Sequence, residues 1–523
     1  MGGYVNNWQF SEVLVQQYKD AIEQSPITRV EIGFRSLERN SQFGLYAYTP
    51  PSEVLTFRSS LPGKQIGIMI NSKELLQAHS HSRSWEESFG ISRKLPCERP
   101  DFVRLATNFN DLERVRELLE HHPPLSDGVE FILNVMQAHA VNDFSEFENP
   151  VWSKNFSTVY LADSFGSMEP GDVRSSVKAL RQSWSGDVGF HAHDNFGLAV
   201  TNSLEAINSG ANIVDGTIRS VGRGAGNAST ESLLLYENVP DGYWQKIRSL
   251  SQSVFRQLQE EFPWGPNIYY QLAANLGIHP TFVQAILSEN RYSGEDIYQA
   301  LLALGDTGRA GSFSPELVDQ VFNQSLPEST GAHDPSSVFK TQNLIVVARG
   351  SSTEGKENVA KFMKAQDSVE VVSINSPPPN IEIGFDFLVS ANPFRMRLEQ
   401  HNARDFSGVV VAPLSAAKEI GIDFVSDGID IGYNQLHEVL SSKELIGLLP
   451  RSTVLYTLAI AVASGVKRVI LIGVDGKKPS GVVDQEFAKG LREFVENCEM
   501  SVVALDTNSL GLEVFNPFLD WED

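Results

Sequence analysis

His191 and His193, separated by a single residue, are the side chains whose type and spacing point most directly to chemistry. They close a run of apolar and small residues, 188–193, that is typical of a β-strand. Residues i and i+2 of a strand project to the same side, so the two imidazoles would converge. Converging imidazoles are natural ligands of a divalent metal ion, and a carboxylate from another strand would complete a set with open positions for substrate. On spacing alone, a pair of hydrogen-bonded core histidines fits equally well.

A glycine-rich segment follows one predicted strand later, at residues 220–228 (Ser-Val-Gly-Arg-Gly-Ala-Gly-Asn-Ala). Glycines that alternate with small residues let backbone amides approach an anionic substrate closely. Glycine-rich turns are common, but this one comes one βα unit after the histidine pair. We therefore expect the segment to contact substrate, with Gly224 and Asn227 among the binding residues.

The elements that would position these residues repeat between residue 29 and about residue 230. Short apolar runs alternate with longer amphipathic stretches, which is typical of βα units with a parallel sheet. A closed barrel needs eight strands and carries its active site at their carboxyl ends. We therefore expect an α/β fold, a TIM (β/α)8 barrel that lacks its first strand in this chain. The predicted strands are 30–34, 65–70, 102–106, 129–135, 158–162, 188–193 and 211–217.

The chain opens on a short loop and a helix, so the missing strand would lie just upstream of Met1. A loose tail on another α/β fold is the alternative. The barrel domain would occupy residues 1–235, and residues 236–325 predict a helical appendage. After a linker rich in proline, glycine and serine, residues 340–523 predict an open, doubly wound Rossmann-like domain. Its predicted strands are 344–348, 370–374, 385–390, 408–412 and 469–473.

Composition narrows the class of protein. With 65 acidic and 42 basic side chains, the 523 residues carry a formal net charge of -23, which repels polyanions. We therefore expect neither nucleic acid nor a membrane as partner. No apolar run approaches the roughly 20 residues of a membrane span, and no signal-peptide pattern is found, so we expect a cytoplasmic protein. Cys97 and Cys498 lack the spacing of a metal site. An enzyme acting on a small molecule, as a monomer or a homo-oligomer, fits best.

The motifs His-Ala-His-Asp-Asn at 191–195 and Gly-x-Gly-Ala-Gly-Asn-Ala at 222–228 resemble those of the DRE-TIM metallolyase superfamily, the HMG-CoA lyase-like group. The resemblance covers residues 1 to about 310 and is closest to the 4-hydroxy-2-oxovalerate aldolases. It implies a divalent metal, Mn²⁺ or Mg²⁺, held by His191 and His193, and a 2-oxoacid substrate. The implied reaction cleaves or forms a carbon–carbon bond through a metal-bound pyruvate enolate.

The start of the chain departs from the family pattern. Family members begin with a strand that ends in Arg-Asp-Gly, whose Asp is the third metal ligand and whose Arg stabilises the enolate. Here Gly2-Gly3-Tyr4 resembles the continuation of that motif, and Met1 falls at the Asp position. Tyr4 takes the place of the His that acts as base in the aldolases, although a phenol is a poor base.

Other residues are assigned by the resemblance or by their position on the predicted barrel. Catalytic roles are expected for Tyr4, for Tyr269 or Tyr270, and for Glu31, which is as readily a structural acid. Substrate contacts are expected from Ser164, Asn195, Gly224 and Asn227.

Three other functions stay open. A Claisen-type acyltransferase of the isopropylmalate and homocitrate synthase kind uses the same superfamily fold. A zinc hydrolase barrel is disfavoured because it takes further histidines from the fifth and sixth strands, where only His139 lies near a suitable end and residues 158–162 carry none. A binding or scaffold protein is the third, since Met1 stands in place of the ligand Asp.

The C-terminal domain carries a weaker signal for a nucleotide. Its first predicted strand leads into Arg-Gly-Ser-Ser, a loop of small residues at a helix start, where Gly350, Ser351 and Ser352 could hold a phosphate. Residues 465–476 resemble the sialyltransferase-like domains associated with bacterial surface glycans. That resemblance implies that Asp475 lies near a nucleotide and that the chain serves surface-polysaccharide biosynthesis. A tight turn and ordinary core packing are the alternatives.

Overall fold

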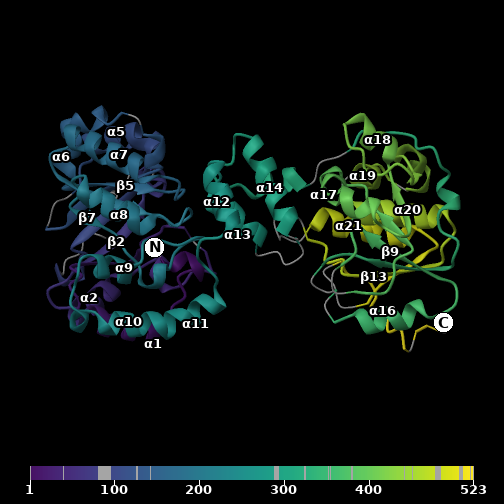
Figure 1. The fold of residues 1–523 in the computed structure, drawn as a ribbon, viewed down its shortest axis with the longest axis horizontal. Helices are drawn as coiled ribbons and strands as arrows, with labels where there is room; N and C mark the ends of the chain where they lie inside the picture. The colour runs from purple at the N-terminus through teal and green to yellow at the C-terminus, as the bar shows by residue number, and fades with distance from the viewer. Residues whose placement is uncertain are drawn as a thin grey trace. The chain divides into compact units, whose positions relative to one another are not determined.

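The computed structural model describes residues 2–523 apart from 39, 80–95, 125–127, 142, 288–291, 293, 323–325, 351–352, 354, 379–380, 441, 450–451, 478–483, 506–509, 519 and 522–523. The chain forms two compact units, Met1–Thr281 and Phe282–Asp523 (Figure 1). The division falls within α13 (Pro280–Leu287), inside the helical region predicted at 236–325.

Unit 1 is built on a curled, parallel sheet of seven strands in the order β1 to β7. Each strand pairs with the next one along the chain, as repeated βα units require. The predicted strands are confirmed to within two residues, except that the last one is only two residues long. The strands are β1 (Arg29–Phe34), β2 (Gln65–Asn71), β3 (Phe102–Asn108), β4 (Glu130–Met136), β5 (Thr158–Asp163), β6 (Asp187–Ala192) and β7 (Ile213–Val214).

Several helices of unit 1 begin at a polar side chain that caps the first turn, and several bury one apolar stripe. Ser11 accepts a hydrogen bond from the Leu14 amide at the start of α1, and Asp194 does the same for the Ala199 amide of α8. Along α5 the residues at helical spacing, such as Val115 and Leu119, are the buried ones. The helices are α1 (Glu12–Ile22), α2 (Pro51–Ser60), α3 (Ser72–His79), α5 (Leu112–His121), α6 (Pro150–Asn155), α7 (Pro170–Ser183), α8 (Ala199–Asn208), α9 (Thr230–Tyr236), α10 (Gln245–Gln252), α11 (Val254–Glu261) and α12 (Ile268–Asn275).

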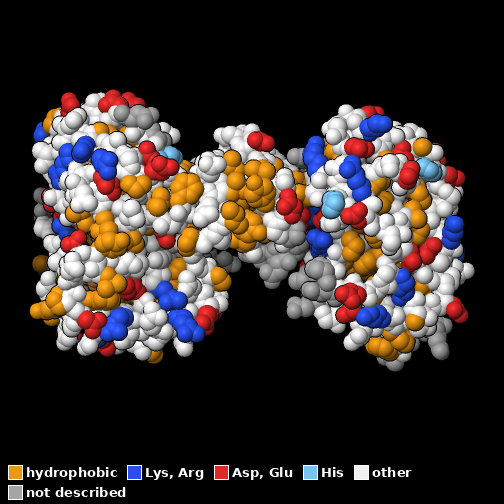
Figure 2. Space-filling view, viewed as in Figure 1, with side chains coloured by type: hydrophobic (Ala, Val, Ile, Leu, Met, Phe, Trp, Pro, Cys, Tyr) orange, Lys and Arg blue, Asp and Glu red, His pale blue; other side chains and the backbone are white. Residues whose placement is uncertain are grey.

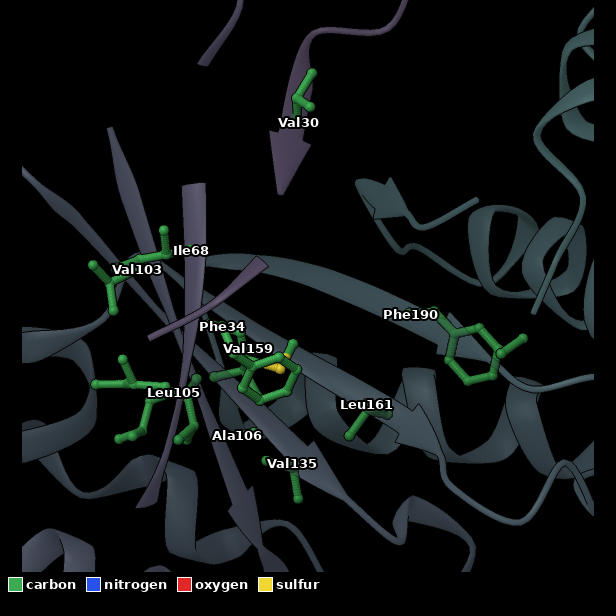
Figure 3. Close-up of a cluster of buried hydrophobic side chains, with 14 of the residues drawn as sticks. Val30, Phe34, Ile68, Val103, Leu105, Ala106, Val135, Val159, Leu161 and Phe190 are labelled. Atoms are coloured by element: carbon green, nitrogen blue, oxygen red, sulfur yellow. The ribbon is translucent and has the colours of Figure 1, made fainter. Parts of the chain in front are cut away.

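The strands of unit 1 divide their side chains between two layers. One set packs into a large apolar cluster, part of which Figure 3 shows, with Val103, Leu105, Val159, Leu161 and Phe190. The alternate positions form a separate layer that contains Phe102, Ile132 and Tyr160. Because the side-chain period of a strand is two, His191 lies on the opposite side from its buried neighbour Phe190. The His191 side chain therefore projects into the same layer as Tyr160.

Glycines make room for the aromatic rings of this second layer. A Cβ at Gly67 would lie 2.1 Å from the Phe102 ring, and a Cβ at Gly189 would lie 2.4 Å from the Tyr160 ring. These contacts are far shorter than van der Waals distance, so both positions require glycine for packing.

The edge strands of the unit 1 sheet, β1 and β7, have no strand between them in the described part of the chain. A cavity of about 580 Å³ opens there instead. Its lining includes Leu14 and Tyr18 of α1, Ile32 of β1, and both residues of β7. The open edge agrees with a barrel that lacks one strand, and Met1, next to which that strand was predicted, lies outside the described residues.

Unit 2 is an open sheet of seven parallel strands in the order β12-β11-β10-β9-β8-β13-β14. The chain starts at β8, moves outward on one side to β12, and returns to the other side at β13, so the strand order reverses between β8 and β13. The five predicted strands are confirmed, whereas β12 and β14 were not predicted. The strands are β8 (Asn343–Val347), β9 (Val369–Ile374), β10 (Phe387–Val389), β11 (Val409–Ala412), β12 (Ile429–Asp430), β13 (Arg468–Ile472) and β14 (Ser501–Ala504).

Both faces of the unit 2 sheet are covered. Along β8, Leu344 and Val346 belong to one apolar cluster, and Ile345 and Val347 belong to another. Burial on both faces is the property of a doubly wound α/β domain, as predicted. Its helices are α14 (Gly294–Asp306), α15 (Pro315–Phe322), α16 (Glu357–Lys364), α17 (Pro393–Arg404), α18 (Leu414–Glu419), α19 (Lys443–Leu448), α20 (Thr453–Ala463) and α21 (Gln485–Asn497).

Side chains of both charges are interspersed over the face of each unit that Figure 2 shows, so the negative net charge is not gathered into one patch there. Among the described helices, none combines the length and the apolar character that crossing a membrane demands.

Replacing Phe190 by Ala tests the packing behind the histidine strand. The Phe190 side chain is 0% exposed, so its loss should lower the free energy of unfolding of unit 1 by about 3–5 kcal/mol. Urea unfolding followed by tryptophan fluorescence measures it, because Trp521 is the one tryptophan of seven outside residues 1–281. Val13→Ala, at a side chain that is 68% exposed, should cost less than about 0.5 kcal/mol. Equal losses for the two variants would contradict the packing described.

Candidate active site

The two histidines meet at the carboxyl end of β6. His191 is the next-to-last residue of the strand and is 1% exposed. His193 follows the strand and forms an isolated bridge with Asn227 of the glycine-rich segment. The ring centroids lie 4.9 Å apart, with the ring planes at 88°. The structure thus brings the predicted pair together at the end of the sheet where barrel active sites lie.

Each histidine is oriented through its Nδ1 atom. His191 Nδ1 lies 3.0 Å from Asp215 Oδ2, and His193 Nδ1 lies 2.7 Å from the carbonyl oxygen of Asp163. A carbonyl oxygen only accepts, so Nδ1 of His193 carries the proton and Nε2 keeps its lone pair. Burial lowers the pKa of His193 to about 3, so the ring is neutral at pH 7. Metal-binding histidines are held in this way, with one nitrogen bonded and the other left for the ion.

The Nε2 atom of His191 is buried and has no hydrogen-bond partner among the described residues. A buried polar atom without a partner is costly, and a metal ion would satisfy it. The residues therefore fit a divalent ion through two imidazole nitrogens. Within the described ranges no cluster of three or more His, Cys, Asp or Glu side chains is placed to hold a metal, so a third protein ligand is not found there.

A buried ion network stands behind His191. Arg104 of β3 pairs with Asp215, and its Nε atom lies 3.1 Å from Glu31 Oε2 of β1. The guanidinium also lies over the Tyr160 ring, 4.1 Å from its centroid. Burial pushes the pKa of Asp215 upward, but the charge of Arg104 and the hydrogen bond from His191 outweigh burial and hold the pKa well below its usual range. Asp215 is therefore ionised and fixes the orientation of His191.

Neither Arg104 nor Asp215 was predicted as a site residue. Arg104 is the one charged residue in an apolar strand, at 102–108, and that is a signal of a buried partner. Asp215 lies next to the end of β7, where parallel strands place functional residues. Glu31, predicted as a catalytic or structural acid, is paired with Arg104.

The glycine-rich segment folds back on itself around Asn227. The Asn227 side chain donates to the Val221 carbonyl at 2.8 Å, and its backbone amide donates to the Ser220 carbonyl at 3.0 Å. A Cβ at Gly222 would lie 2.1 Å from Nδ2 of Asn227, so only glycine fits. Gly224 has a φ of +61° and packs against the ring of Tyr270. Asn227 therefore holds the segment beside His193.

Arg223, at the tip of this segment, was not predicted either. Its guanidinium lies 3.8 Å from the centroid of the Tyr4 ring, and its Nη1 lies 3.4 Å from Nε2 of His279. The Thr281 amide meets Nδ1 of His279 at 3.3 Å, so both ring nitrogens face a donor, although a neutral imidazole can accept at only one of them. Burial and the charge of Arg223 lower the pKa of His279 to about 4. No ion pair joins Arg223 to a carboxylate in the described part of the chain, so the pair is suited to bind an anion.

The remaining predicted residues have other partners. Ser164 Oγ accepts a hydrogen bond from the Gln137 amide at 2.8 Å and so holds a turn. Asn195 is 1% exposed, and its side chain donates to the Tyr270 carbonyl at 3.5 Å. The ring of Tyr270 packs against Gly224 of the glycine-rich segment. Tyr269 donates its backbone amide to the Asn267 side chain, and a catalytic role for it stays a prediction.

In unit 2, Gly350 and Asp475 lie close together. The Gly350 amide donates to the Gly473 carbonyl at 2.8 Å, and a Cβ at Gly350 would lie 2.6 Å from Cγ of Asp475. Ser351 and Ser352, predicted with them, lie outside the described residues.

Asp215→Asn tests the orientation of His191. The amide cannot act as an ionised acceptor for His191 and Arg104 together, so we expect the affinity for Mn²⁺ to fall about 10–100-fold. Isothermal titration of the full chain measures the affinity. Glu130→Gln is the control, because it also removes a carboxylate from an arginine pair, Arg29–Glu130 at 2.9 Å, away from the histidines. An unchanged affinity in Asp215→Asn, or an equal fall in both variants, would speak against this role.

Comparison with known proteins places the site within a family. Residues 65–244 match the HMGL-like family model. A 4-hydroxy-2-oxovalerate aldolase of Carboxydothermus hydrogenoformans is 32% identical over 236 residues, which cover 43% of this chain and 67% of that protein. The protein of the same name from Bacillus thuringiensis is 38% identical over 134 residues, 25% of this chain and 39% of that protein.

Among solved structures, the N-terminal domain of a Bacteroides vulgatus protein assigned as an aldolase has 28% sequence identity, with 57% of this chain and 96% of that chain covered. Its TM-score of 0.47 is too low to add to the assignment. One relative is 32% identical and is covered over 67% of its length, and residues 65–244 match the family model. The chain therefore belongs to the HMGL-like family.

Proposed function

We propose that unit 1 is a divalent-metal-dependent aldolase, a carbon–carbon lyase that releases or adds pyruvate on a 4-hydroxy-2-oxoacid. The observation that carries the proposal is the pair of imidazoles, each fixed through Nδ1 so that Nε2 is left for an ion. The name of the aldolase relatives supports the substrate class. Mn²⁺ and Mg²⁺ are the ions proposed, in line with the family resemblance.

An ion held by His191 and His193 would polarise the 2-keto oxygen of the substrate. When the C3–C4 bond breaks, its electron pair moves onto the three-carbon fragment to give the enolate of pyruvate. The C4 hydroxyl passes its proton to water as the aldehyde forms, and one proton is taken up at the enolate carbon, so that the reaction is balanced overall. The chain must then bind a carboxylate and supply a proton to the enolate carbon.

Arg223 is suited to the first of these tasks. It lies beside His279 and His193, and a substrate carboxylate placed there would accept from the guanidinium and from the Nε2–H tautomer of His279. The planar guanidinium also favours two parallel hydrogen bonds to a carboxylate. We propose that Arg223 and His279 hold the carboxylate end of the 2-oxoacid.

Tyr4 is suited to the second task. Burial raises the pKa of Tyr4, more than the neighbouring Arg223 lowers it, so the hydroxyl keeps its proton at neutral pH. A protonated phenol is a donor and not a base. We propose that Tyr4 donates a hydrogen bond or a proton, in place of the basic role that its sequence position suggested. A role in surface-glycan synthesis rests on the C-terminal resemblance alone and stays a prediction.

Pyruvate release from 4-hydroxy-2-oxovalerate in the presence of Mn²⁺ tests the proposed activity. The full chain should form pyruvate, and His193→Ala should lower kcat/KM at least about 100-fold, since an ion without its ligand loses position and charge stabilisation. His121→Ala, at an exposed histidine of α5, should leave the rate unchanged. Absence of pyruvate from protein that binds Mn²⁺, or full activity in His193→Ala, would refute the aldolase reaction.

Arg223→Gln tests the carboxylate contact. Loss of a charge-assisted hydrogen bond costs about 1.5–3 kcal/mol, so we expect KM for the 2-oxoacid to rise about 10–100-fold. The affinity for Mn²⁺ should not change, and Arg223→Lys should recover part of the loss. The control is Arg174→Gln, which removes a pair with Glu205 on an exposed helix face. A changed Mn²⁺ affinity with an unchanged KM would assign Arg223 to the metal site instead.

A further inference from the structure

A second pocket lies within unit 2, at the carboxyl ends of its strands. Its volume is about 300 Å³, and it is lined by the residues that follow β8, β9, β10 and β13 and by the first turn of α20. The strand order reverses between β8 and β13. In open α/β sheets, ligands bind in the crevice formed at such a reversal, because the two loops there turn to opposite faces. The pocket therefore stands where this fold binds small molecules.

Two arginines enter the pocket from a rigid support. Arg395 Nη1 lies 2.6 Å from Asp296 Oδ1, and Arg349 Nη1 lies 3.4 Å from Glu399 Oε1. Both carboxylates are buried, at 1% and 4% side-chain exposure, whereas Arg349 and Arg395 keep 21% and 14%. The buried carboxylates of Asp296 and Glu399 therefore hold the guanidinium groups of Arg395 and Arg349 in place. The remaining N–H groups are oriented before a ligand arrives, which reduces the entropy lost on binding.

Asn375 adds a neutral donor. Its Oδ1 atom accepts from Ser390 Oγ at 3.1 Å and from Thr453 Oγ1 at 3.2 Å. With the oxygen engaged by two hydroxyls, the amide nitrogen is the group left to donate into the pocket.

Helix α20 contributes its N-terminus. The Ser452 side chain caps the Leu455 amide, so Thr453 and Val454, which both line the pocket, are the first-turn residues whose amides no helix carbonyl can reach. Helix N-termini with free amides favour phosphate. The arginines, the Asn375 amide and this helix end form one set of donors for an anion.

Acidic groups follow β13. Asp475 lines the pocket together with Asp484, and Gly350 beside Asp475 has no side chain to fill the space. Carboxylates accept hydrogen bonds from hydroxyl groups but repel phosphate. A ligand that carries both an anionic group and hydroxyls would match the donors and the carboxylate of Asp475 together.

We propose that this pocket binds a phosphorylated sugar, with the phosphate on Arg349, Arg395, Asn375 and the α20 N-terminus and the sugar hydroxyls on Asp475. The chemistry is shared by nucleoside monophosphates and by simple sugar phosphates. The proposal does not depend on the aldolase reaction.

Isothermal titration of the full chain distinguishes the two sources. The probes are the nucleoside monophosphates AMP, CMP, GMP and UMP, then glucose 1-phosphate, and then cytidine and glucose without phosphate. At least one phosphate ester should bind at least 10-fold more tightly than its unphosphorylated partner, and inorganic phosphate should compete. Binding of a nucleoside monophosphate but not of glucose 1-phosphate would show that the base is recognised. Binding of glucose 1-phosphate but not of the nucleotides would show that the phosphorylated sugar is sufficient. No binding by any ester, or equal affinity with and without phosphate, would overturn the proposal.

Asn375→Asp is the variant of choice, because the new carboxylate can still accept from Ser390 and Thr453 while it removes the donor and adds a negative charge. We expect the affinity for the phosphate ester to fall at least 10-fold. Asn497→Asp adds the same charge on the exposed end of α21 and should change nothing. Circular dichroism confirms that the variants fold, and aldolase activity should be unchanged in both. An unaltered affinity in folded Asn375→Asp would remove the pocket as the site.

Discussion

The positive charge of Arg104, buried inside the sheet of unit 1, is the constraint on which the candidate site depends. A guanidinium away from water is tolerated only where carboxylates pair with it, and Glu31 and Asp215 do so from either side. Asp215 thereby stays ionised and accepts from His191. Removing Arg104 would leave two carboxylates without a cation, so the orientation of the first imidazole depends on charge as well as on packing.

The second imidazole is held by backbone rather than by charge. The carbonyl of Asp163 and the bridge to Asn227 fix His193, and the folded glycine-rich segment carries Arg223 to its side. Neighbouring parallel strands end at the same edge of a sheet, which is why residues far apart in sequence arrive together. Unit 2 follows the same rule at the reversal beside β8, where its donors gather.

Local patterns in the sequence predicted the strands, but not which side chains contact one another across the sheet. The apolar periods gave nearly all strands, and the His-x-His spacing placed both rings on one side because the strand period is two. The strands β12 and β14 were missed, and both are edge strands of the unit 2 sheet, each paired with one other described strand. Arg104 and Asp215 are 111 residues apart in the sequence, and Arg223 and His279 are 56 residues apart. Both contacts form only when the strands align in register and the loops close, and local sequence patterns do not show this. The one sequence signal for the Arg104–Asp215 pair was a charged residue within an apolar strand.

The central claim is that His191 and His193 bind one divalent ion through Nε2. Pulsed EPR of Mn²⁺ bound to the full chain, prepared once with natural histidine and once with ¹⁵N-histidine, measures this directly. The account predicts couplings from two imidazole nitrogens that change on isotopic labelling and that fall to one in His193→Ala. Bound Mn²⁺ without any histidine nitrogen coupling, or with couplings that survive replacement of both residues, would contradict it.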